Sequence, residues 1–272
     1  MSKSKIIAAA WGFREMGTEK YLKCVKELGF AGVEIHVDSD PKEARNSLYS
    51  QATNVENKRI QSLSKKYGVD IASFAIGNDF TLGNDNDLLV QIEKVKKAVD
   101  LASKLNVSEI RIFAGFIDKS KITTTTYNKL WDCLNKVGDY AQKKKVCLCI
   151  ENHGGITAGG EDCLKVLKNV KSSAIAINCD PANFCYYGED PLVGLKKVAK
   201  YVQYTHWKDV HKRNGKLEYC ALGEGIIDWK PIIAKLKDIN YKGYYAVEYE
   251  TIADVQRGAF LSANVLRMLG VK

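Results

Sequence analysis

Short apolar segments recur along the chain, and longer segments with apolar residues at helical spacing lie between them. The short segments are rich in β-branched residues, which favour strands, whereas apolar residues three or four positions apart favour amphipathic helices. The short segments predict eight strands, at residues 6–12, 32–37, 70–77, 109–115, 146–152, 174–180, 201–207 and 244–250. The longer segments predict eight helices, at residues 14–29, 46–68, 84–106, 123–145, 161–171, 191–200, 228–240 and 252–269.

Strand and helix alternate eight times over 272 residues. Each unit therefore has about 34 residues, which is the period of a (β/α)8 barrel. Several predicted helices end in glycine or asparagine, the residues that most readily adopt the left-handed backbone of a helix end. An open doubly wound sheet is the alternative, but the first strand is followed by WGFREMG (11–17) and not by GxGxxG. We predict an α/β protein with one domain over residues 1–272, a TIM barrel.

The composition is that of an ordinary globular protein, with 46% hydrophobic and 27% charged residues. No segment approaches the ~18 consecutive apolar residues of a membrane span, and the N-terminus does not resemble a signal peptide. We therefore expect a cytoplasmic protein with no membrane partner. The eight cysteines include no CxxC pair, which favours reduced packing residues. The net charge of +9 is spread over predicted helix faces, so it does not indicate a nucleic-acid partner, and anionic substrates stay compatible with it.

Ionisable residues stand at the carboxyl ends of four consecutive predicted strands, where such barrels have their active sites. They are Glu151, Asp180, His206 and Glu248. An apolar strand that ends in an ionisable residue costs free energy unless the charge finds a partner. Three carboxylates and one imidazole suit one divalent metal ion, with Mn²⁺ or Mg²⁺ favoured and Co²⁺ or Zn²⁺ also compatible. The alternative is that a separate salt bridge or helix cap satisfies each residue.

Five segments resemble the xylose isomerase-like superfamily of barrels, specifically its sugar phosphate isomerase/epimerase proteins. They are CIENHGG (149–155), INCDPANF (177–184), YTHWKDV (204–210), LGEGIIDW (222–229) and AVEYE (246–250). The resemblance covers essentially the whole chain and implies the same four metal ligands. It also implies that Glu151 and Glu248 are the acid/base pair of an isomerase or epimerase, which moves a proton of a keto sugar through a metal-bound enediolate. Barrels of this family often form dimers or tetramers, so a homo-oligomer is compatible with the sequence.

Two positions depart from the ketose 3-epimerases of the superfamily. Six residues after Glu151, those enzymes have a further Glu, and this chain has Thr157. Three residues after Asp180, they have His, and this chain has Asn183. His153 lies on the same side of its strand as Glu151 and offers another base, because imidazole titrates near neutral pH. The ENH segment also resembles lyases of the superfamily, such as inosose dehydratase-like and 3-oxo-glycoside-eliminating enzymes. The alternative for His153 is a hydrogen bond that holds Glu151.

Other residues near the strand ends are candidates for contact with a small sugar substrate, namely Trp11, Glu34, His36, Asn183 and Lys208. Lys208 could hold a hydroxyl or phosphate group, or it could pair with an acidic neighbour. Glu34 and His36 could contact the substrate, or they could form a buried ion pair. We expect Asp209 to orient other groups and Arg111 to complete a charge network inside the barrel.

A DNA repair enzyme is a remote alternative, because AP endonucleases of the endonuclease IV type share this barrel and the chain is basic. Those enzymes use several histidines to hold three zinc ions. This chain has four histidines in total, and Asn183 stands where a histidine is usual. The sequence therefore argues against such a cluster, and the intact set of four ligands argues against a metal-free binding protein.

Overall fold

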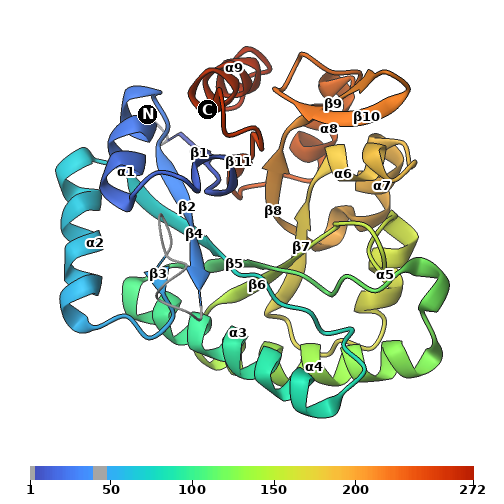
Figure 1. Ribbon diagram of the computed structural model, residues 1–272. Helices are drawn as coiled ribbons and strands as arrows, with labels where there is room; N and C mark the ends of the chain where they lie inside the picture. Colours follow the sequence, from blue (N-terminus) through green and yellow to red (C-terminus); the bar gives the residue numbers. More distant parts are fainter. Residues whose placement is uncertain (1–3, 39–47) are drawn as a thin grey trace.

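The computed structural model describes residues 4–38 and 48–272, and its centre is a closed barrel of eight parallel strands (Figure 1). Strand β1 pairs with β2 on one side and with β11 on the other, which closes the sheet. In order around the barrel, the strands are β1 Ile6–Ala8, β2 Gly32–Asp38, β4 Asp70–Ala75, β5 Glu109–Ile112, β6 Cys147–Glu151, β7 Ile175–Cys179, β8 Val202–Trp207 and β11 Tyr245–Val247. Each overlaps one predicted strand, so the predicted TIM barrel is confirmed.

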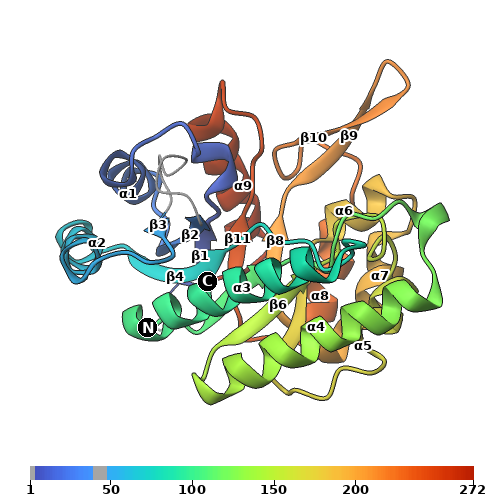
Figure 2. The same ribbon diagram turned by 60° about the horizontal axis from the view of Figure 1, so that its bottom comes forward.

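Helices surround the barrel, and each of the eight predicted helices has a counterpart (Figures 1 and 2). They are α1 Thr18–Glu27, α2 Asn54–Tyr67, α3 Asp85–Leu105, α4 Thr124–Lys143, α5 Gly160–Leu167, α7 Pro191–Val198, α8 Trp229–Asp238 and α9 Val255–Met268. The predicted stops are confirmed, since Gly29, Gly68, Asn106 and Asn240 have φ angles between 55° and 78°. Among the described residues, no helix combines the length and the apolar character that crossing a membrane requires.

Several elements were not predicted from the hydrophobic pattern. Residues Leu48–Tyr49 form a short strand β3 beside β2, inside the stretch predicted as helix 46–68, whose first two residues lie outside the described part. Helix α2 begins only at Asn54, because Thr53 and Glu56 form a capping box there. A short helix α6 (Pro181–Tyr186) follows β7. Single 3₁₀ turns occupy Trp11–Phe13 (η1), Lys119–Lys121 (η2) and Ala199–Tyr201 (η3).

An antiparallel hairpin follows β8 directly and projects away from the barrel (Figure 2). Its strands are β9 (Asp209–Arg213) and β10 (Lys216–Cys220). Asn214 and Gly215 connect them with φ angles of 50° and 80°. Two successive positive φ angles are typical of the type I′ turn, which matches the twist of a hairpin.

The interior of the barrel is layered along its axis. One buried cluster is apolar and consists of Ile7, Ala9, Ala72, Cys149, Tyr204 and Ala246. Because alternate residues of a strand face the same side, the next inward positions towards the carboxyl ends include Glu151 after Cys149 and His206 after Tyr204. The fold therefore places an apolar layer below a layer of ionisable residues.

Candidate metal centre

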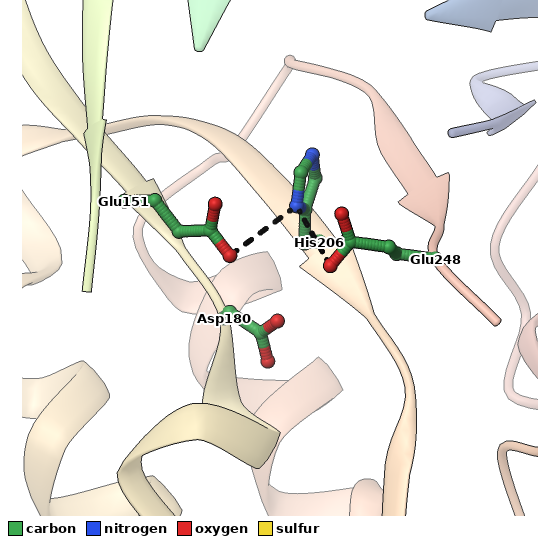
Figure 3. A group of neighbouring side chains, drawn as sticks. All are labelled: Glu151, Asp180, His206 and Glu248. Atoms are coloured by element: carbon green, nitrogen blue, oxygen red, sulfur yellow. Dashed lines mark ion pairs between the residues drawn. The ribbon is translucent and has the colours of Figure 1, made fainter. Parts of the chain in front are cut away.

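The four predicted ligands come together at the carboxyl ends of their strands (Figure 3). Glu151 ends β6 and His206 lies in β8, whereas Asp180 and Glu248 directly follow β7 and β11. One ligand atom from each residue lies within 4.8 Å of the other three, and all four residues are buried. Asp180 also caps α6, because its Oδ1 accepts hydrogen bonds from two backbone N–H groups of that helix. Its Oδ2 lies 2.7 Å from Nζ of Lys208.

The imidazole of His206 is held by one nitrogen and presents the other to the cluster. Its Nε2 lies 2.9 Å from Oε2 of Glu34. Its Nδ1 lies 3.6 Å from Oε1 of Glu151 and 3.4 Å from Oε2 of Glu248, and it makes no hydrogen bond with a described residue. Burial lowers the pKa of His206, but Glu248, Glu34 and Glu151 raise it well above its ordinary value. A carboxylate behind a histidine is the usual support of a metal-binding imidazole.

The carboxylate of Glu151 has a partner at each oxygen. Nε of Arg111 lies 3.3 Å from Oε2, and Nδ2 of Asn183 donates a hydrogen bond of 3.1 Å to Oε1. Burial and the charge of Glu248 raise the pKa of Glu151, but His206 and Arg111 lower it to about 2. The carboxylate is therefore ionised at neutral pH, and the charge network expected for Arg111 is confirmed.

Lys208 is 1% exposed and pairs with three carboxylates. Its Nζ lies 2.7 Å from Oδ2 of Asp180, 2.5 Å from Oε2 of Glu248 and 2.9 Å from Oε1 of Glu250. Burial lowers the pKa of Lys208, but Asp180 and Glu248 raise it well above its ordinary value. Of the two alternatives for Lys208, the structure shows the pairing with acidic neighbours.

Carboxylates outnumber cationic side chains around the four candidate ligands, so a bound cation would balance the charge. Five carboxylates converge there, those of Glu34, Glu151, Asp180, Glu248 and Glu250. Their cationic partners are Arg111, Lys208 and His206. His206 carries a positive charge only when its imidazole is protonated. Buried charges without partners are costly, and Nδ1 of His206 lacks a hydrogen-bond partner among the described residues. The donor set, the spare negative charge and this nitrogen all fit a divalent metal ion.

A cavity of about 360 Å³ opens above the cluster. Its walls include Glu151 and Glu248, together with Trp11, His36, Asp38, Arg111, Phe113, Phe116, His153 and Glu250. Of the residues expected to contact substrate, Trp11 and His36 therefore line this cavity. Burial and the charge of Arg111 lower the pKa of His36, which favours a neutral imidazole there.

Three other residues expected to contact substrate, Glu34, Asn183 and Lys208, are not among the residues that line this cavity. Glu34 is completely buried and pairs with His206. Asn183 is also completely buried, and its amide contacts Glu151. Lys208 is bound by its acidic neighbours. All three side chains hold other residues of the site.

His153 lies on the cavity wall among aromatic rings. The centroid of its ring is 5.2 Å from that of Phe113 and 6.1 Å from that of Phe116, and Tyr187 lies 6.5 Å away. Its backbone N–H donates to Oγ1 of Thr157. Within the described ranges, the ring of His153 makes no hydrogen bond with Glu151. The structure therefore does not show the alternative role, in which His153 would hold Glu151.

Asp209 organises the loop between the hairpin and α8, as expected of an orienting residue. Its carboxylate accepts hydrogen bonds from the backbone N–H of Gly223 at 2.9 Å and from Nε1 of Trp229 at 2.8 Å. The loop approaches so closely that a Cβ atom at Gly225 would lie 2.1 Å from Oδ1 of Asp209. Asp228 then caps α8.

Two tyrosines of the site were not among the predicted residues. The hydroxyl of Tyr204 donates to Oε2 of Glu34 at 3.0 Å, and Tyr204 is two residues before His206 on the same face of β8. The hydroxyl of Tyr219 donates to Oδ1 of Asn183 at 2.7 Å. The sequence carries a signal for each, since alternation along β8 points Tyr204 inward and an Asn-Gly pair indicates the hairpin that carries Tyr219.

A family model described as xylose isomerase-like TIM barrel matches residues 22–267. Inosose dehydratase of Clostridium perfringens (strain 13 / Type A) is 30% identical over 158 residues, which cover 52% of this chain and 52% of that protein. The chain thus matches about half the length of this relative. Inosose dehydratase of Geobacillus thermodenitrificans is 23% identical over 261 residues, or 87% of this chain and 84% of that protein.

Solved structures with the same fold include enzymes of two reaction types. The probable 3-DHS dehydratase involved in petrobactin synthesis from Bacillus anthracis has a TM-score of 0.79 and 19% identity, with 97% of this chain and 98% of that chain covered. A D-psicose 3-epimerase, solved in the presence of D-fructose, has a TM-score of 0.80 and 16% identity, with 97% and 99% covered. At this identity, the likeness concerns the fold alone.

Proposed function

The chain belongs to the xylose isomerase-like TIM barrel family, and from this premise we propose that it is a metal-dependent enzyme acting on a sugar or sugar derivative with a carbonyl group. Glu151, Asp180, His206 and Glu248 would hold one divalent ion, with Mn²⁺ or Mg²⁺ favoured. Their burial and proximity support this site. A related barrel protein from Mycobacterium smegmatis was solved in complex with magnesium. When bound, such an ion polarises a carbonyl and lowers the cost of negative charge beside it.

We propose elimination of water as the reaction. A base removes the proton next to the carbonyl, the electron pair of that C–H bond forms a C=C bond, and the C–O bond on the next carbon breaks. The leaving hydroxyl takes up a proton and departs as water. His153 is the proposed base, and its imidazolium can return the proton to the leaving group. The relatives named inosose dehydratase support this reaction type.

One observation carries the choice of His153. Both oxygens of Glu151 already have partners, Arg111 and Asn183, and Glu248 is paired with Lys208. These carboxylates are fixed in place, as ligands of a metal should be. The ring of His153 lines the cavity, packs beside Phe113 and Phe116, and makes no hydrogen bond with a described residue. It is therefore a side chain on this wall that can take a proton from a bound molecule.

Isomerisation or epimerisation of a keto sugar is the second candidate. It is favoured by the position of Glu151 and Glu248, which line the same cavity and could act on a substrate as acid and base. Against it, Thr157 replaces the further Glu of ketose 3-epimerases, and its side chain is buried in hydrogen bonds with the backbone of Glu151 and Gly154.

The two candidates are separated by the product formed in D₂O. The protein with Mn²⁺ is incubated with an inosose, a 3-oxo-glycoside and simple ketoses, and the products are followed by NMR and ultraviolet absorption. Elimination gives an unsaturated carbonyl product, whereas epimerisation gives a stereoisomer that carries deuterium and has lost no water. We expect His153→Ala to lose elimination activity by about 100-fold or more and to keep its metal.

His211→Ala is the matched control for His153→Ala, because His211 lies on the hairpin and pairs with Glu218. It should leave activity unchanged. A stereoisomer without an unsaturated product would reject elimination in favour of the second candidate. Full elimination activity in His153→Ala would reject His153 as the base.

A further inference from the structure

The hairpin contacts the candidate metal centre through a chain of two hydrogen bonds. Tyr219 lies near the end of β10 that returns to the barrel. Its hydroxyl donates to Oδ1 of Asn183 at 2.7 Å, and Nδ2 of Asn183 donates to Oε1 of Glu151 at 3.1 Å. Asn183 is completely buried in α6, between the two partners. The hairpin and the end of β6 are thus joined across a single amide group.

The chemistry of these groups fixes which way the amide points. An ionised carboxylate only accepts hydrogen bonds, so the side of Asn183 that faces Glu151 must be the donor NH₂ group. The reversed amide would place two acceptor oxygens face to face in a buried site, which is costly. The hydroxyl of Tyr219 supplies a donor for the amide oxygen on the other side. Tyr219 and Glu151 therefore favour the same orientation of Asn183.

Oε1 of Glu151 is also the carboxylate oxygen that lies 3.6 Å from Nδ1 of His206. It is therefore the oxygen that faces the centre, while Oε2 is near Arg111. We propose that Tyr219 is a positioning residue, which acts through Asn183 to orient the Glu151 carboxylate towards a bound metal ion. This inference rests on the metal site of the proposed function and adds the hairpin to it.

Tyr219→Phe tests the hydroxyl alone. The phenyl ring can still lie over Nζ of Lys208, which is 4.8 Å from the ring centroid of Tyr219, and stack on Tyr186 at 4.9 Å. Tyr186→Phe is the matched control, because it removes the same atom from the stacked ring, whose hydroxyl makes no hydrogen bond among the described residues. The metal-free proteins are titrated with Co²⁺, and binding is followed by calorimetry and by the visible spectrum of Co²⁺.

We expect Tyr219→Phe to bind Co²⁺ about tenfold more weakly, with a changed visible spectrum, and Tyr186→Phe to match the unchanged protein. Asn183→Leu should weaken binding at least as much. Tyr219→Phe should add no further loss in the Asn183→Leu background, since the two residues act in series. A purely structural role of Tyr219 would lower thermal stability without changing Co²⁺ affinity or spectrum.

Unchanged Co²⁺ affinity and spectrum in Tyr219→Phe would overturn the inference, and so would a full additional loss in the double variant. Because Co²⁺ binding needs no substrate, the result is separate from the reaction. Weaker binding in Tyr219→Phe supports the inference even where no elimination is found, and unchanged binding leaves the proposed elimination standing. If the protein without any substitution binds no Co²⁺, both the proposed metal site and this inference are overturned.

Discussion

Nζ of Lys208 lies 2.7 Å from Oδ2 of Asp180, so a buried ammonium group contacts one of the four residues that could hold a metal ion. The same ammonium group contacts Glu248, a second of the four. Lys208 therefore balances negative charge that a bound cation would also balance. The ammonium group of Lys208 thus partly neutralises Asp180 and Glu248 when no metal ion is bound.

Replacement of Lys208 should destabilise the metal-free protein strongly. Lys208→Met leaves buried carboxylates without their partner, so we expect the free energy of unfolding in EDTA to fall by about 3–5 kcal/mol. Urea denaturation measures this loss, and saturating Mn²⁺ should restore part of it. Lys230→Met, at an exposed position, should have little effect. Equal stability of the two variants would contradict the role given to Lys208.

Removal of metal should lower the melting temperature of the protein. A ligand at 100 times its Kd stabilises the folded state by about 2.7 kcal/mol, so adding Mn²⁺ after EDTA treatment should raise the melting temperature. Asp180→Asn and His206→Ala should lose this response, whereas His211→Ala should keep it. Metal analysis should find about one ion per chain. A normal metal content in both ligand variants would reject the assigned site.

Loss of the Asp209 carboxylate should disturb the loop that precedes α8. Gly223 and Trp229 both donate to Oδ2 of Asp209, and the backbone N–H groups of Val210 and Ile227 donate to Oδ1. Asp209→Asn replaces one of these oxygens with an NH₂ group, so a pair of donors loses its acceptor at either oxygen. We expect a loss of about 1–3 kcal/mol in the free energy of unfolding, measured by urea denaturation. Asp238→Asn makes the same change at an exposed position and should be neutral. A neutral Asp209→Asn would show that these hydrogen bonds contribute little.

Asp162 should contribute stability that depends on pH. It pairs with Lys119 at 2.8 Å and with Lys165 at 3.3 Å, which joins the loop after β5 to α5. Burial raises the pKa of Asp162, but the bonds with the two lysines lower it below its ordinary value. The folded protein therefore binds this proton less tightly than the unfolded chain. The stabilisation is present above the unfolded pKa of about 3.9 and is lost as the pH falls through the folded pKa.

The measurement is the difference in unfolding free energy between the unchanged protein and Asp162→Asn, taken from pH 7 downwards. We expect the unchanged protein to be more stable at neutral pH and the difference to vanish in acid. Asp132→Asn is the control, because Asp132 pairs with Lys136 on the exposed face of α4. A difference that grows as the pH falls would mean that folding raises the pKa of Asp162, contrary to this prediction.

The barrel and the convergence of its four ionisable strand ends could be predicted because both depend on local features. Apolar strands and amphipathic helices have distinct periods, and strand ends in such a barrel meet at one place. Depth inside the barrel could not be predicted in the same way. His36 and Glu34 are two residues apart on one strand and face the same side, yet His36 lines the cavity and Glu34 lies below it. The partner of Glu34, His206, is 172 residues away.

Short elements were missed although they have local signals. Asp180 followed by Pro181 is a typical start of a helix, but α6 is only six residues long. Asn214-Gly215 is a strong hairpin signal, but the strand residues around it are largely exposed and lack a clear apolar pattern. The contact of Tyr219 with Asn183 depends on how α6 and the hairpin pack together, and no pattern within either segment determines that.

The layering of the barrel interior separates the residues that support His206 from the residues that shape the cavity. Glu34 holds the imidazole of His206 and Tyr204 holds Glu34, and neither Glu34 nor Tyr204 lines the cavity. His36 and Phe113 form part of the cavity wall. Substitutions in the wall can therefore change which molecules fit while the support of the imidazole stays intact. A library of variants at His36 and Phe113 is thus a rational starting point for redirecting this barrel to new substrates.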